Sequence, residues 1–158
     1  VWDFGVLYRL KQLKTFQIGL ALQNIGPDAK YSISREGEPL PYTLRIGIAN
    51  KVILPAESYI CFTMELTKVL TGLADDFAYG GFDYIWEDTW KAFGCELSIA
   101  NISRVYLGFF RDDVGHRTGP TFGYGITLRS FRIDISTDAK IYEFETDNWH
   151  LQLSYTHE

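Results

Sequence analysis

Hydrophobic and polar residues alternate along most of this chain with a period of two, which is typical of β-strands that have two unlike faces. The pattern predicts nine strands and no convincing amphipathic helix. The expected strands cover residues 2–9, 15–24, 43–51, 58–67, 92–100, 104–111, 121–129, 130–138 and 147–156. Most of them approach the about 9–11 residues of a membrane-spanning strand, and they exceed the about 5–6 residues of an average globular strand.

The two faces of the predicted strands differ in chemistry. One face carries no charge and is built from aliphatic and aromatic residues such as Ile18, Leu20 and Ile46. The other face carries arginines, carboxylates and amides, with Gly, Ala and Ser between them. The charged residues of the polar face that we expect to pair in a lumen network are Arg45, Glu65, Glu96, Arg104, Arg132 and Asp134. This combination predicts an all-β fold, an antiparallel transmembrane β-barrel with lipid outside and a polar lumen inside.

Connection lengths and aromatic positions agree with this prediction. The expected connections alternate between short (10–14, 52–57, 101–103, 129–130) and longer (25–42, 68–91, 112–120, 139–146). Outer-membrane barrels have short periplasmic turns and longer outer loops, with aromatic girdles at both interfaces. The aromatic residues expected near the outer ends are Trp2, Phe93, Phe109, Phe122 and Trp149, and those near the inner ends are Tyr8, Phe16, Phe131 and Tyr155.

Composition narrows the class of protein further. The chain has 158 residues, 46% of them hydrophobic, which suits a single domain. A net charge of −5 argues against a nucleic-acid-binding face. No apolar run approaches the about 20 residues of a membrane-spanning helix. Cys61 is expected on the polar face and Cys95 on the apolar face, so we predict no disulfide between them.

The segment 68–91 is expected to be an extracellular loop, and it is the one place where a short helix or an irregular lid fits. Its aromatic residues are Phe77, Tyr79, Phe82, Tyr84, Trp86 and Trp90. Such residues in an exposed segment indicate a lid over the barrel mouth, a docking patch for a partner or a surface on lipid, and the first two are preferred. Its acidic residues are Asp75, Asp76, Asp83, Glu87 and Asp88. Their spacing does not match an EF-hand loop, so solvated carboxylates are favoured over a Ca²⁺ site.

No set of residues predicts catalysis. Glu65 and Glu96 lie on adjacent predicted strands with both side chains inward, and paired carboxylates can perform acid–base chemistry. The arginines beside them favour a structural ion-pair network instead. The serines lack a nucleophile-elbow context, and the histidines lack metal-ligand spacing. We therefore expect a protein that is not an enzyme, without cofactor or metal.

A series of segments resembles a known family. The segments are DFGVLY (3–8), IGLALQNIG (18–26), LPYTLRIGIA (40–49), GCEL (94–97), RVYLGF (104–109), FGYGI (122–126), RID (132–134) and HLQLSY (150–155). In order along the chain, they are similar to the PorV/PorQ-type outer-membrane proteins of the FadL-like β-barrel superfamily. The resemblance implies a 14-stranded barrel in a Gram-negative outer membrane, with this sequence, residues 1–158, as its C-terminal nine or so strands.

The resemblance implies two kinds of function. A FadL-like barrel passes hydrophobic small molecules, whereas a PorV-like barrel serves type IX secretion and holds cargo or partner proteins at its outer loops. The alternative fold is a soluble lipocalin-like or sandwich β-protein that binds a hydrophobic ligand. That alternative predicts a dry core containing Leu20, Ile46, Leu97 and Ile133, with Arg45, Glu96 and Arg132 facing water.

Overall fold

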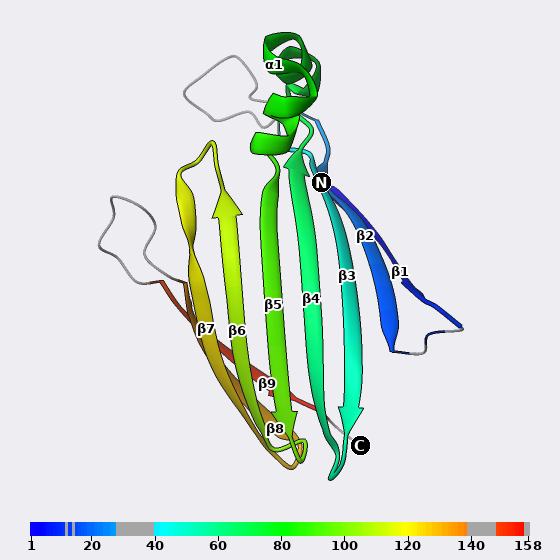
Figure 1. Cartoon of the computed structure of the whole chain (residues 1–158), viewed down its shortest axis with the longest axis vertical. Coiled ribbons are helices and arrows are strands. Elements are labelled where there is room, and N and C mark those ends of the chain that lie inside the picture. The colour runs from blue at the N-terminus through cyan, green and yellow to red at the C-terminus, as the bar shows by residue number, and fades with distance from the viewer. Residues whose placement is uncertain (12, 14, 28–39, 139–147, 157–158) are drawn as a thin grey trace.

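The computed structural model contains one antiparallel sheet of nine strands and one helix (Figure 1). It describes residues 1–11, 13, 15–27, 40–138 and 148–156. The strands are β1 (Trp2–Arg9), β2 (Phe16–Ile25), β3 (Thr43–Leu54), β4 (Ser58–Val69), β5 (Trp90–Ile99), β6 (Ser103–Asp112), β7 (Arg117–Leu128), β8 (Phe131–Asp138) and β9 (Trp149–Tyr155), and the helix is α1 (Leu73–Glu87). The predicted all-β class and the nine antiparallel strands are confirmed.

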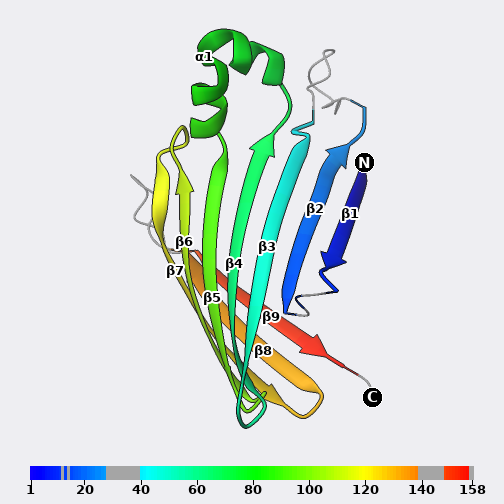
Figure 2. The ribbon, with the colours of Figure 1, turned by 45° about the vertical axis from the view of Figure 1, so that its right-hand side comes forward.

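Each strand pairs with the strand that precedes it and the strand that follows it, so the sheet order is the sequence order. The sheet curls along this order, and α1 stands at one end of it, above β4 and β5 (Figure 2). The first and last strands, β1 and β9, are both edges and do not pair with each other. The described strands therefore form an open sheet, and the closed barrel of the prediction is not present in them.

Several strands are longer than the alternation predicted. β3 and β4 continue to a three-residue connection at 55–57, so the predicted turn 52–57 is half strand. β7 begins at Arg117, which shortens the predicted outer loop 112–120 to the four residues 113–116. Pro120 lies within β7 opposite Phe109 although it has no N–H to donate. The predicted loop at 139–146 lies outside the described residues.

The segment between β4 and β5 is a helix and not an irregular loop. α1 spans fifteen residues, with a break at Gly81, where φ is 65° and ψ is −149°. A residue with a side chain rarely adopts this backbone conformation, so glycine permits the kink. The predicted loop aromatic Trp90 does not belong to this segment, because it is the first residue of β5. No helix among the described residues is long and apolar enough to cross a membrane.

The described residues contain no buried hydrophobic core. The apolar residues of the central strands remain exposed along one face of the sheet. For example, 41% of the surface of Ile48 is exposed. Residues on the edge strands are more exposed still, such as Leu151 at 67%. Apart from Gly125, the buried residues are polar or charged: Thr67, Lys68, Thr89, Lys91, Ser98 and Asp112. This distribution is the reverse of a water-soluble fold, in which apolar side chains are buried first.

Candidate functional site on the polar face of the sheet

The polar face brings all six predicted network residues into ion pairs. The pairs are Arg45–Glu65, Arg104–Glu96 and Arg132–Asp134, with nearest nitrogen–oxygen distances of 2.6, 3.5 and 2.6 Å. The three pairs do not form one continuous network. The Arg45 pair lies toward the end of the sheet that carries α1, and the other two lie toward the opposite end.

The Arg132 pair is part of a closed triangle with Tyr106. Arg132 donates from Nε to Asp134 Oδ2 (2.6 Å) and from Nη2 to the Tyr106 hydroxyl (2.7 Å), and that hydroxyl donates to Asp134 Oδ1 (2.8 Å). Tyr106 belongs to β6 and its partners belong to β8, so its side chain crosses β7. It can cross because β7 carries Gly123 and Gly125 there. A Cβ on Gly125 would lie 2.3 Å from Asp134 Oδ1.

The Glu96 pair recruits a second tyrosine. The Tyr59 hydroxyl donates to Glu96 Oε1 at 2.6 Å, and Arg104 Nη1 donates to Thr127 Oγ1 at 2.9 Å. Arg104 Nε is 3.5 Å from Glu96 Oε1 but is not aligned for a hydrogen bond, so this ion pair is the weakest of the three in geometry. Buried Ser98 lies opposite both Tyr59 and Arg104 in the register, and its hydroxyl has no partner among the described residues.

The sequence prediction missed the tyrosines of these clusters. Tyr59 and Tyr106 lie at inward positions of the same alternation that selected Glu96 and Asp134. The predicted polar network did not include these tyrosines, because the sequence prediction treats tyrosine as an apolar residue. It buries an apolar ring while its hydroxyl needs a hydrogen-bond partner, and both demands are met where the ring lies on the sheet and the hydroxyl reaches a carboxylate.

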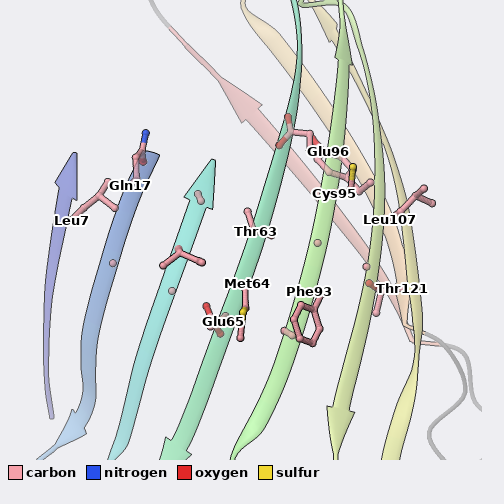
Figure 3. Close-up of a pocket in the computed structure, with 18 residues that line it drawn as sticks. Leu7, Gln17, Thr63, Met64, Glu65, Phe93, Cys95, Glu96, Leu107 and Thr121 are labelled. Atoms are coloured by element: carbon pink, nitrogen blue, oxygen red, sulfur yellow. The ribbon is translucent and has the colours of Figure 1, made fainter. Parts of the chain in front are cut away.

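Small residues leave a cavity of about 540 Å³ across the middle of this face. Figure 3 shows residues of β1, β2, β4, β5, β6 and β7 around it, among them Gln17, Thr63 and Glu96. Gly47, Gly94 and Gly108 form part of its floor. A Cβ on Gly108 would lie 2.3 Å from the Thr121 hydroxyl oxygen, so the neighbouring threonine already fills the space above that glycine. The cavity is a consequence of the small-residue positions recognised in the sequence.

A second cluster on the polar face lies at the end that carries α1. Trp90 and Phe110 meet edge to face with ring centroids 6.3 Å apart. The Arg117 guanidinium lies over both rings, 4.9 Å from the Trp90 centroid. Arg117 also donates to Asp112 Oδ2 at 2.5 and 2.8 Å, and Asp112 is 2% exposed. None of these contacts was predicted, because Trp90 was expected in the loop 68–91, and Asp112 and Arg117 in the loop 112–120.

α1 is held to the sheet by two lysines of the apolar face. Lys68 continues the row of Met64 and Leu66 on β4, and it forms ion pairs with Asp76 (2.8 Å) and Asp88 of the helix region. Lys91 on β5 donates to the backbone oxygen of Trp86 at 2.6 Å. Both lysines are buried, and both lie outside the predicted strand bounds: Lys68 follows the predicted end at residue 67, and Lys91 precedes the predicted start at residue 92.

The helix itself buries no residue completely. Five of the six predicted aromatic residues of the segment lie on it. Four of them pair across the kink: Phe77 with Phe82 at 5.2 Å and Tyr79 with Tyr84 at 5.1 Å between centroids. Tyr79 and Phe82 are 82% and 78% exposed.

The described residues do not assemble a metal or disulfide site. No group of three or more His, Cys, Asp or Glu side chains in this part of the chain is arranged to hold a metal ion. Two of the acidic residues of the segment 68–91, Asp76 and Asp88, pair with Lys68. Cys61 and Cys95 are both free thiols. Cys61 pairs in register with Glu96, and Cys95 with Phe62, which places the two cysteines at successive positions of one ladder and on opposite faces.

The carboxyl group of Asp113, at the end of the sheet, has a shifted pKa. Asp113 follows β6 and accepts a hydrogen bond from Arg111 Nε at 2.6 Å and another from Lys91 Nζ at 3.1 Å. The hydrogen bond from Arg111, followed by that from Lys91, holds the pKa of the Asp113 carboxyl below its ordinary value, because both cations stabilise the ionised form.

Comparison with known proteins does not assign the chain to a family. No protein-family model matches the chain, and no curated protein matches it.

Proposed function

We propose that this chain forms part of the wall of an outer-membrane β-barrel of a Gram-negative bacterium, PorV- or FadL-like, and that it acts in transport or secretion without catalysis. One observation carries the proposal: across the nine strands, the exposed face is apolar while the opposite face carries paired charges. Lipid satisfies the first face, and an enclosed polar lumen suits the second.

The free edges indicate what else the barrel needs. β1 and β9 each leave a row of backbone groups unpaired, and such groups cost several kcal/mol each in hydrocarbon. In a sheet of nine antiparallel strands, the first and last strands run in the same direction. An all-antiparallel closure therefore requires an odd number of further strands between them. The fourteen strands implied by the resemblance would supply five, since 14 − 9 = 5.

The polar face favours some functions over others. A tunnel for hydrophobic small molecules needs an apolar lining, whereas the face described here carries three ion pairs and the Tyr106 triangle. Exposed Tyr79 and Phe82 on α1 suit contact with a cargo or partner protein outside the membrane. Of the two functions implied by the resemblance, these observations favour partner binding over the passage of hydrophobic small molecules, and the polar face also suits the passage of polar molecules.

The soluble alternative places Leu20, Ile46, Leu97 and Ile133 in a dry core. In the described sheet, Leu97 is half-buried and the other three are exposed, and no second sheet or helix packs on their face. A lipocalin-like or sandwich fold would need such a layer, because it turns its apolar face inward. No observation on the polar face calls for this fold.

Fractionation of cells that express the full chain tests the proposal. We expect the protein in the outer-membrane fraction, resistant to high salt and extracted only by detergent. A periplasmic protein and a known outer-membrane barrel, followed in the same gradients, are the controls. Recovery of folded protein from the aqueous supernatant without detergent contradicts the proposal and supports the soluble alternative.

A further inference from the structure

A separate cavity of about 520 Å³ lies on the polar face between Arg45 and Trp90. The register places Arg45 beside Thr67 and Thr67 beside Trp90, so β3, β4 and β5 contribute one residue each to a single row. Thr67 and Ala92 form the floor, and Phe110 extends the aromatic side. The cavity therefore has a charged wall on one side and an aromatic wall on the other, with small residues between them.

The charged wall has hydrogen-bonding capacity left over. Arg45 donates from Nε and Nη2 to Glu65 Oε1, at 3.0 and 2.6 Å, and Thr67 donates to the same oxygen at 3.1 Å. Glu65 Oε2 accepts no hydrogen bond from a described residue, and Arg45 Nη1 makes only a 3.5 Å contact with Gln23. One carboxylate oxygen and one guanidinium nitrogen thus remain as an acceptor–donor pair. Their charges already balance, so the wall offers hydrogen bonds without net charge.

The aromatic wall is held in place and is also neutral. Arg117 reaches the Trp90 ring from β7, on the side away from β3, while the edge-to-face contact with Phe110 fixes the ring's tilt. The charge of Arg117 is balanced by buried Asp112. Trp90 itself lines the cavity. An aromatic face of this kind carries partial negative charge and attracts weakly positive C–H groups.

We infer that this cavity binds a neutral saccharide unit. A sugar ring has one face of C–H groups for Trp90 and a rim of hydroxyls that donate to Glu65 Oε2 and accept from Arg45. A fatty-acid carboxylate fits less well, because both nearby arginines are already neutralised by carboxylates of this chain. The inference rests on the proposed function and deepens it: the barrel handles a carbohydrate at the end of its lumen nearest α1.

Calorimetric titration of the detergent-solubilised full chain tests this site. The detergent must carry no sugar, so lauryldimethylamine oxide is used in place of maltosides and glucosides. The probes are the neutral disaccharides maltose, cellobiose and lactose, with laurate as the competing ligand class. We expect saturable binding of at least one disaccharide. We expect Trp90→Ala and Glu65→Gln each to weaken it by about tenfold or more, equivalent to about 1.4 kcal/mol.

Trp86→Ala is the matched control, since Trp86 lies four residues earlier on α1 and does not line the cavity. We expect it to bind as the parent chain does. Glu65→Gln keeps the shape of the wall, so it remains informative if Trp90→Ala does not fold. Absence of disaccharide binding, laurate binding in its place, or equal affinity in Glu65→Gln and the parent overturns the inference. If the protein fractionates with the outer membrane but binds no disaccharide, only the saccharide site is contradicted. If the protein is recovered from the aqueous fraction and binds a disaccharide, only the barrel proposal is contradicted.

Discussion

Neighbouring residues of one strand meet opposite environments in this protein. On β8, Ile133 and Ile135 are exposed on the apolar face, whereas Arg132 and Asp134 pair on the polar face. The two charged residues form an ion pair, whereas each of the two isoleucines leaves 43% of its surface exposed. In water, a sheet that leaves its apolar side chains exposed gains little from the hydrophobic effect, which is the main driving force of folding. The charges of β8 are therefore paired within the chain itself, while its apolar residues depend on what surrounds the chain.

The strongest way to break this comparison is to place the same charge on each face in turn. Ile48 and Ala49 are adjacent at the middle of β3 and point to opposite faces. We expect Ile48→Arg to destabilise the protein in lipid vesicles by about 2–4 kcal/mol, the cost of an arginine at the bilayer midplane. We expect Ala49→Arg to cost about 1 kcal/mol or less. Denaturant unfolding of the vesicle-bound protein measures both; equal, small costs would mean that Ile48 faces water.

A second prediction sharpens the view that the polar face is stabilised by pairing. Asp134→Ala removes the acceptor shared by Arg132 and Tyr106. We expect a loss of about 1–2 kcal/mol, less than the 3–5 kcal/mol of a fully buried pair, because Arg132 is 41% exposed and screened by solvent. The control is Asp138→Ala, whose carboxylate is 3.7 Å from exposed His150, with an expected effect within about 0.5 kcal/mol. Equal effects of the two variants would show that the triangle adds nothing.

A third prediction concerns the rim, where the apolar face becomes polar. Lys68→Met removes the cation that joins Asp76 and Asp88 to β4. We expect amide hydrogens of residues 73–87 to exchange about tenfold faster or more, while those of β4 keep their protection, because α1 opens as a local unit. Lys51→Met serves as the control, since Lys51 lies over the Tyr59 ring and not against α1. Unchanged exchange in α1 would mean that Lys68 does not anchor the helix.

The smallest expected effect is the titration of Asp113. Its folded-state pKa is lowered, so its stabilising contribution is present above the unfolded value of about 3.9 and is lost as pH falls through the lower folded value. Carboxyl chemical shifts followed by NMR should show a midpoint below that of an ordinary aspartate. We expect Arg111→Gln to move the midpoint upward, since it removes the largest cause of the shift. A midpoint that does not move would assign the shift to another group.

Alternation predicted the sheet well because the two faces follow from the period of two alone. Ile46 and Arg45 are on opposite faces in any strand that contains both. Strand ends were predicted less well, since Pro120 and Lys68 are usual signs of a loop or an edge and lie inside strands here. The sequence predicts a helix only as one option for residues 68–91, because the two halves on either side of Gly81 are each too short for a clear helical period.

By itself, the sequence determined which residues share a face, and therefore that Glu65, Glu96 and Asp134 lie with arginines and not with the isoleucines. Only the tertiary structure decided which charges meet. The pairing of Arg132 with Asp134 and Tyr106 depends on a side chain that crosses the glycines of β7, and the cavity between Arg45 and Trp90 depends on the register of β3, β4 and β5. The physical reason is range: the side-chain alternation is local along the chain, whereas register and side-chain reach are set between strands that lie far apart in sequence.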